Sequence, residues 1–124
     1  MLQLLAIAGG GALGAVFRFG VSNGVHRVLG RDFPYGTLAV NVIGSLLMGL
    51  LFTLFVERLA LSAEWRSAIF IGFLGAFTTF STFSFETISL IQSGALLRAM
   101  LNIVISILLC LGATWLGLGL GRQL

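Results

Sequence analysis

Long runs of apolar residues dominate the chain, and short polar stretches separate them. Four runs are long enough to cross the hydrocarbon core of a membrane as helices, which takes roughly 20 apolar residues each. They predict helices at about residues 2–26, 36–57, 65–92 and 97–121. None of the runs alternates apolar and polar positions, as transmembrane β-strands do. The pattern therefore predicts an all-α integral membrane protein, with four transmembrane helices in one domain (1–124).

The composition agrees with a membrane protein and argues against a soluble enzyme. Of the 124 residues, 58% are hydrophobic and only 9% are charged, which is too few for the surface of a soluble domain. One histidine and one cysteine make neither a Cys/His ligand cluster nor an intrachain disulfide. We therefore expect no enzymatic activity and no binding of nucleic acid.

The arginines give the chain no preferred orientation in a membrane. Four crossings joined by short loops place both termini and the loop at 57–66 on one side. Each side holds three arginines: Arg58, Arg66 and Arg122 on this side, and Arg27, Arg31 and Arg98 on the other. The positive-inside rule derives orientation from an excess that is missing here. Either another signal sets the orientation, or the chain inserts both ways and forms an antiparallel dual-topology homodimer.

A hydroxyl-rich run interrupts the apolar pattern of the third helix. Seven of the twelve residues from Thr78 to Ser89 carry a hydroxyl group, and Phe80, Phe83 and Phe85 lie among them. Hydroxyl groups pair with backbone groups that leave helical geometry inside a membrane, so we predict a third helix broken near its middle. Broken helices coordinate ions through freed carbonyls, and the electropositive edges of phenyl rings attract anions. The alternative is an unbroken helix with incidental Ser and Thr.

Two further sets of polar residues lie in apolar helices. Asn41 either bonds a neighbouring helix or presents its side-chain N–H to an anion. Asn102, Ser106, Cys110 and Thr114 follow one another at four-residue intervals and so share one face of the fourth helix. This stripe predicts either a path lined by hydroxyl groups or a seam between helices.

The first helix contributes small residues and one of two deeply placed charges. Gly10 with Gly14, and Gly20 with Gly24, have the four-residue spacing that lets membrane helices approach closely. Arg18 and Glu86 are the charges farthest inside apolar segments. Such charges face protein or water and are usually paired, so a pair between these two is a candidate.

Three stretches closely resemble the CrcB/Fluc fluoride channels: GGGALGAVFR (9–18), GTLAVNVIGS (36–45) and GAFTTFSTFSFE (75–86). The similarity covers essentially the whole chain. It implies a passive channel in the inner membrane of a prokaryote that exports fluoride from the cytoplasm and gives fluoride resistance. It also implies an antiparallel homodimer with two pores.

The resemblance assigns roles to individual residues as well. Phe80 and Phe83 would line the pores with their ring edges, and Asn41 would coordinate fluoride. Gly75 and Thr78 would donate backbone carbonyls to one structural Na⁺ on the dimer axis, which is not transported. Further hydroxyl groups are candidates for the pore lining: Thr37, Ser81, Thr82, Ser106 and Thr114.

Two other functions share some of these features. A small dual-topology multidrug antiporter has the same size, helix number and charge balance. It needs a membrane-embedded acid at its substrate site, whereas the first helix offers Arg18 and Glu86 is the only embedded acid. A non-transporting accessory subunit of a membrane complex accounts for the glycines but not for the hydroxyl–phenyl run.

Overall fold

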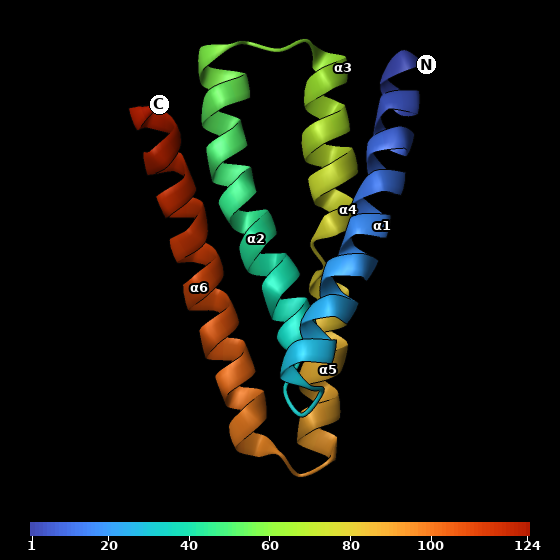
Figure 1. Cartoon of the computed structure of the whole chain (residues 1–124), viewed down its shortest axis with the longest axis vertical. Helices are drawn as coiled ribbons and strands as arrows, with labels where there is room; N and C mark the ends of the chain where they lie inside the picture. The colour runs from blue at the N-terminus through green and yellow to red at the C-terminus, as the bar shows by residue number, and fades with distance from the viewer.

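The computed structural model describes all 124 residues, and every regular element in it is helical (Figure 1). Four helical segments are long and apolar enough to cross a membrane: Leu2–Leu29, Tyr35–Arg58, Ala63–Gln92 and Leu96–Gln123. The protein is therefore an all-α, multi-pass membrane protein, as predicted. Both termini and the connection between the second and third segments lie at one end of the molecule, and the other two connections lie at the opposite end.

The two middle segments are composed of several helical elements. The first and fourth segments are single α-helices, α1 (Leu2–Leu29) and α6 (Leu96–Gln123). The second joins α2 (Tyr35–Leu51) to the π-helical η1 (Phe52–Arg58). The third contains α3 (Ala63–Arg66), the π-helical η2 (Ser67–Leu74), α4 (Gly75–Phe77) and α5 (Phe80–Gln92).

Local sequence signals set the ends of the third segment. Ser62 is the N-cap of α3, and its hydroxyl oxygen accepts a hydrogen bond from the backbone N–H of Trp65 at 3.5 Å. Glu64 lies in the first turn, where a negative charge is favourable. Gly94 follows α5 with φ 85°, a left-handed conformation that glycine adopts without strain.

Glycines allow α1 to lie directly against η2. A Cβ atom at Gly14 would overlap the backbone carbonyl of Phe73, and one at Gly10 would overlap a carbonyl in η2 as well. At Gly20 and Gly24 no atom of another segment lies within 4 Å of a Cβ position. The close approach that the spacing predicted occurs at the first glycine pair and, within this chain, not at the second.

A second glycine contact joins α2 to α6. Gly49 and Gly117 face each other so closely that a Cβ atom on either would overlap backbone atoms of the other helix. Figure 1 shows these two helices running side by side; near the termini they lie apart from α1 and the first half of the third segment, and at the opposite end α2 meets α1. The single chain thus contains two closely packed pairs, α1 with η2 and α2 with α6. The two pairs diverge toward the end of the molecule at which both termini lie.

Candidate functional site

The third spanning segment leaves helical geometry at two residues, Thr78 and Thr79. Thr78 has φ −86° and ψ 156°, and Thr79 has φ −151° and ψ 119°, so both are extended. Helical geometry resumes at Phe80, the first residue of α5. The interruption lies inside the hydroxyl-rich run and is visible between α4 and α5 in Figure 1.

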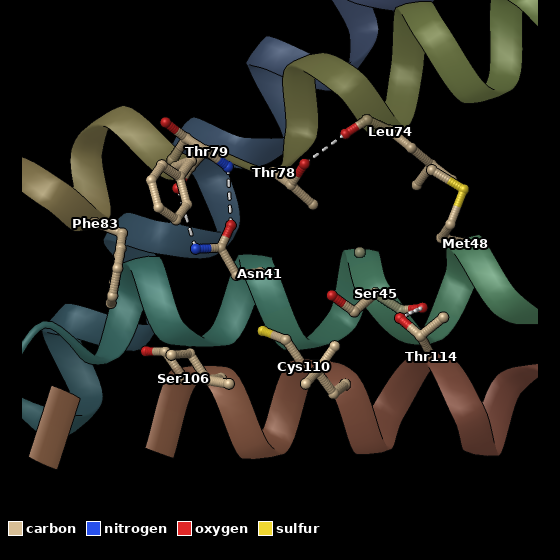
Figure 2. Close-up of a pocket in the computed structure, with 14 residues that line it drawn as sticks. Asn41, Ser45, Met48, Leu74, Thr78, Thr79, Phe83, Ser106, Cys110 and Thr114 are labelled. Atoms are coloured by element: carbon tan, nitrogen blue, oxygen red, sulfur yellow. Dashed lines mark hydrogen bonds between the residues drawn. The ribbon is translucent and has the colours of Figure 1, made fainter. Parts of the chain in front are cut away.

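Asn41 of α2 bonds both backbone polar groups of Thr79. Its Oδ1 accepts a hydrogen bond from the Thr79 N–H at 2.8 Å, and its Nδ2 donates to the Thr79 carbonyl at 3.1 Å (Figure 2). Of the two interpretations that the sequence left open for Asn41, the structure contains the contact between helices.

Hydroxyl groups pair with the backbone on both sides of the interruption. The Thr78 hydroxyl donates to the carbonyl of Leu74 at 3.0 Å. The Thr79 oxygen Oγ1 accepts from the Thr82 N–H at 3.3 Å and so caps the first turn of α5. It also lies 3.2 Å from the Thr82 hydroxyl and 3.3 Å from the Ser81 hydroxyl. Hydroxyl groups of the run thus pair with backbone groups at the point where helical geometry ends.

The same bonds free two backbone carbonyls. In a continuous helix the carbonyl of Gly75 would accept from the N–H of Thr79, which here donates to Asn41 instead. The carbonyl of Thr78 would accept from the N–H of Thr82, which donates to the Thr79 hydroxyl. Gly75 is exposed in the single chain. Carbonyl oxygens without amide partners suit a hard cation.

A cavity of about 400 Å³ lies between the interruption, α2 and α6 (Figure 2). Fourteen residues line it and none of them is charged. The predicted site residues among them are Asn41, Thr78, Phe80, Phe83, Ser106 and Thr114. Cys110 of the polar stripe also lines the cavity, as do Ser45 and Thr79, which the sequence did not mark as site residues. The structure therefore collects most of the predicted anion-contacting groups in one place.

Two phenyl rings belong to this cavity and a third does not. The ring centroids of Phe80 and Phe83 are 5.4 Å apart, with planes inclined at 45°. Phe85 lies outside the cavity with 74% of its surface exposed, as expected for a residue on another face of α5. Phe80 is 77% exposed in the single chain, so much of its ring is free to meet a further partner.

The polar stripe of α6 bonds both of its neighbours. The Thr114 hydroxyl donates to the carbonyl of Ser45 in α2 at 3.1 Å. The Asn102 Nδ2 donates to the hydroxyl of Thr87 in α5 at 2.9 Å, and the Ser106 hydroxyl donates to the Asn102 Oδ1 at 3.3 Å. Asn102 and Thr87 are buried. The stripe is thus both a seam between helices and, at Ser106 and Thr114, a cavity wall.

A second, more polar cavity lies on the other side of Thr79. It has a volume of about 270 Å³ and includes the predicted residues Arg18, Thr37 and Thr82. Arg18 is the only charged residue in its lining. Thr79 lines both cavities, so the residue that Asn41 holds lies between them.

Three predicted residues line neither cavity: Gly75, Ser81 and Glu86. Glu86 has a buried carboxylate oxygen, Oε1, without a hydrogen-bond partner. Arg18 instead faces the hydroxyl-lined second cavity. The candidate pair of Arg18 and Glu86 is therefore not formed through this oxygen within the chain.

The chain is similar to known proteins over almost its whole length. Residues 5–118 match the family described as CrcB-like protein, Camphor Resistance (CrcB). A protein of Methylococcus capsulatus is 58% identical over 123 residues, which cover 99% of this chain and 54% of that longer protein. Proteins of Hydrogenovibrio crunogenus and Magnetococcus marinus are 54% and 53% identical, and the matches cover 93% and 98% of their lengths. All three carry the name fluoride-specific ion channel FluC. The chain therefore belongs to the CrcB-like family.

Proposed function

We propose that this protein is a passive, fluoride-selective channel that releases fluoride from the cytoplasm. The observation that carries the proposal is the uncharged cavity in which two phenyl rings and Asn41 face the hydroxyl groups of α6. The names of relatives that match almost the whole chain support the same anion.

The cavity offers what a small, strongly hydrated anion needs when it loses water. Side-chain N–H and O–H groups replace part of the hydration shell, and ring edges of Phe80 and Phe83 add attraction without a formal charge. A charged side chain in direct contact with the anion would bind it tightly and slow its release. Conduction requires binding that is strong enough for entry and weak enough for exit, which uncharged groups provide.

Passive export follows from the acid–base chemistry of fluoride. Undissociated HF crosses a membrane and dissociates in the less acidic cytoplasm, where the anion is trapped. A channel that conducts the anion alone lets it leave down its gradient and lowers the cytoplasmic concentration. We propose that the protein acts in the inner membrane of a prokaryote, where this release would give fluoride resistance.

We further propose that one Na⁺ binds the carbonyl oxygens of Gly75 and Thr78 as a structural ion. Support comes from the hydrogen bonds that leave both carbonyls without their helical amide partners. A cation there supplies fixed positive charge near the anion path, which the protein's own uncharged lining lacks. Two carbonyls from each of two chains would provide four oxygen ligands.

The functional unit that we propose is an antiparallel homodimer of chains inserted in both orientations. The equal numbers of arginines at the two ends support it. The wide exposure of Phe80 and Gly75 in a single chain also fits a second copy that completes the site. A two-fold axis in the membrane plane would give each pore the same residues.

Fluoride efflux from liposomes tests the proposal against its rivals. Purified protein in vesicles loaded with fluoride should release it, as measured by a fluoride electrode, and vesicles loaded with chloride should retain it. Release that requires an opposing proton gradient and a cationic substrate would identify an antiporter instead. Vesicles that release neither anion would point to an accessory subunit.

A further inference from the structure

We propose that Asn41 and Thr79 form a positioning pair that holds the third spanning segment in its interrupted conformation. The pair thereby fixes where α5 begins and where the rings of Phe80 and Phe83 lie. Its consequence for ion selectivity rests on the proposed channel function, whereas its effect on the backbone does not.

The two bonds from Asn41 select an extended Thr79 over a helical one. In an extended residue the N–H and the C=O point to the same side of the chain, so one planar amide can reach both. In an α-helix the same two groups point in opposite directions along the axis. Thr79 has φ −151° and ψ 119°, and Asn41 bonds its N–H at 2.8 Å and its carbonyl at 3.1 Å. These bonds exist only in the interrupted form, so they shift the equilibrium toward it.

The side chain of Thr79 extends the effect to α5. Its Oγ1 accepts from the N–H of Thr82 at 3.3 Å, which satisfies a backbone donor that the interruption would otherwise leave unpaired. Phe80 is the first residue of α5, and Phe83 lies one turn further. The cap therefore sets the position from which both rings reach the cavity.

Positioning and anion binding by Asn41 are separable. A side-chain amide has two N–H donors, and one of them is used by the Thr79 carbonyl. Asn41 also lines the larger cavity, so its second N–H remains available to an anion. A measurement of backbone order at residues 79 and 82 therefore reports the positioning role, and a measurement of flux alone does not.

Three variants of the whole protein test the pair. Asn41→Leu keeps the approximate size of the side chain and removes both bonds to Thr79. Thr79→Val keeps the shape of the side chain and both backbone bonds to Asn41 but removes the cap on Thr82. Thr79→Ser keeps the hydroxyl group and is the matched control.

Site-resolved hydrogen exchange in purified protein is the first readout. Asn41→Leu should speed exchange of the Thr79 amide, and Thr79→Val should speed exchange of the Thr82 amide, each by about tenfold, because each amide loses its acceptor. Thr79→Ser should exchange like the wild type. Dimer content on size exclusion is recorded for every variant.

The zero-current potential between fluoride and chloride solutions is the second readout. This potential is independent of the number of folded channels, so simple loss of protein does not move it. Asn41→Leu and Thr79→Val should shift it toward the chloride equilibrium potential, because displaced rings discriminate less between the anions. Thr79→Ser, which restores the hydroxyl group that Thr79→Val lacks, should bring the potential back toward the wild-type value.

Several results would overturn the proposal. Normal exchange with reduced fluoride flux in Asn41→Leu would make Asn41 a ligand alone. Faster exchange with an unchanged zero-current potential would make the pair a structural contact without influence on the ion path. If Asn41→Leu does not fold, Asn41→Ala, which also removes both bonds to Thr79, replaces it in both measurements. A wild type without fluoride current would defeat the channel function, and the exchange rates would still show whether the pair holds the interruption.

Discussion

Phe80 and Phe83 are the residues on which the proposed anion site depends most. Their rings lie 5.4 Å apart at a cavity that contains no charged side chain. Asn41 and the hydroxyl groups also face the cavity, but hydrogen bonds to Thr79 and Ser45 occupy part of their capacity. The ring edges are free of such competition, and their attraction for an anion is electrostatic.

Replacement of either ring by an aliphatic side chain should therefore reduce fluoride transport strongly. We expect Phe80→Ile and Phe83→Ile each to lower fluoride efflux from liposomes by more than tenfold, or about 1.4 kcal/mol of barrier. Phe85→Ile is the matched control, because Phe85 lies outside the cavity, and its efflux should stay near the wild-type value. Efflux at the wild-type rate from correctly assembled Phe80→Ile and Phe83→Ile would rule out the ring-edge mechanism.

The interrupted third segment is the element that connects the sequence to the site. Two extended residues bring Asn41 to Thr79, start α5 at Phe80 and free the carbonyls of Gly75 and Thr78. Without the interruption these carbonyls would lie inside a continuous hydrogen-bonded helix. The carbonyls proposed to bind Na⁺ are thus exposed by the geometry of the element and not by any single side chain.

Removal of sodium tests the freed carbonyls. Replacement of Na⁺ by a larger organic cation on both sides of the membrane should reduce fluoride flux, because the proposed structural ion would be lost. Thr78→Ser should be mild, since the proposed ligand is the backbone carbonyl. Fluoride efflux that proceeds equally well after exhaustive removal of sodium would argue against a structural ion.

The crossing of α1 with η2 gives a prediction about stability. Gly14→Ala should destabilise the protein by about 1–3 kcal/mol, because the added methyl group overlaps the backbone carbonyl of Phe73. Gly20→Ala, on the same helix with open space around it, should be neutral or slightly stabilising. The temperature at which the size-exclusion peak is lost compares the two variants. Equal behaviour would contradict the close crossing.

The elements were more predictable from sequence than the contacts between them. Apolar run length locates the four spans, and hydroxyl density marks the region where the third leaves helical geometry at Thr78 and Thr79. The bond between Asn41 and Thr79 joins residues 38 positions apart and depends on how two helices are rotated. Sequence spacing contains no information about that rotation. For the same reason it did not distinguish Gly10 and Gly14, which meet η2, from Gly20 and Gly24.

Thr79 shows the same limit within the site. Thr followed three residues later by Thr82 fits an N-cap, but in a run with seven hydroxyl groups several positions fit equally well. The backbone angles identify Thr79 as the residue that caps α5. The packing of the helices around it shows that Thr79 also lines both cavities. The depth of Arg18 and Glu86 likewise did not determine whether they meet: Arg18 lines the second cavity, and the buried Oε1 of Glu86 has no hydrogen-bond partner.

At the scale of the whole molecule, the dominant feature is the equal number of arginines at the two ends. The ends carry three arginines each, and Figure 1 places both termini at the same end. Neither end of such a molecule is favoured on the cytoplasmic side by the positive-inside rule. Both orientations should therefore be found in one membrane.

A single accessible cysteine tests this orientation. In a Cys110→Ser background, a cysteine added after Leu124 should react with a membrane-impermeant thiol reagent from either side of the membrane. About half of the molecules should be labelled in intact cells and the remainder only after the membrane is opened. Labelling from one side alone would exclude the dual-topology dimer.

The central claim is that the protein conducts fluoride passively, and the zero-current potential of the wild type tests it most directly. Purified protein is placed in a planar bilayer with a tenfold fluoride gradient, equal chloride on both sides and a proton gradient that is varied independently. If the protein is a passive, fluoride-selective channel, the current should vanish near the fluoride equilibrium potential, about 59 mV for this gradient. That potential should not move when the proton gradient changes. A zero-current potential that follows the proton gradient, or one well below the fluoride equilibrium potential because chloride also carries current, would contradict passive and fluoride-selective conduction.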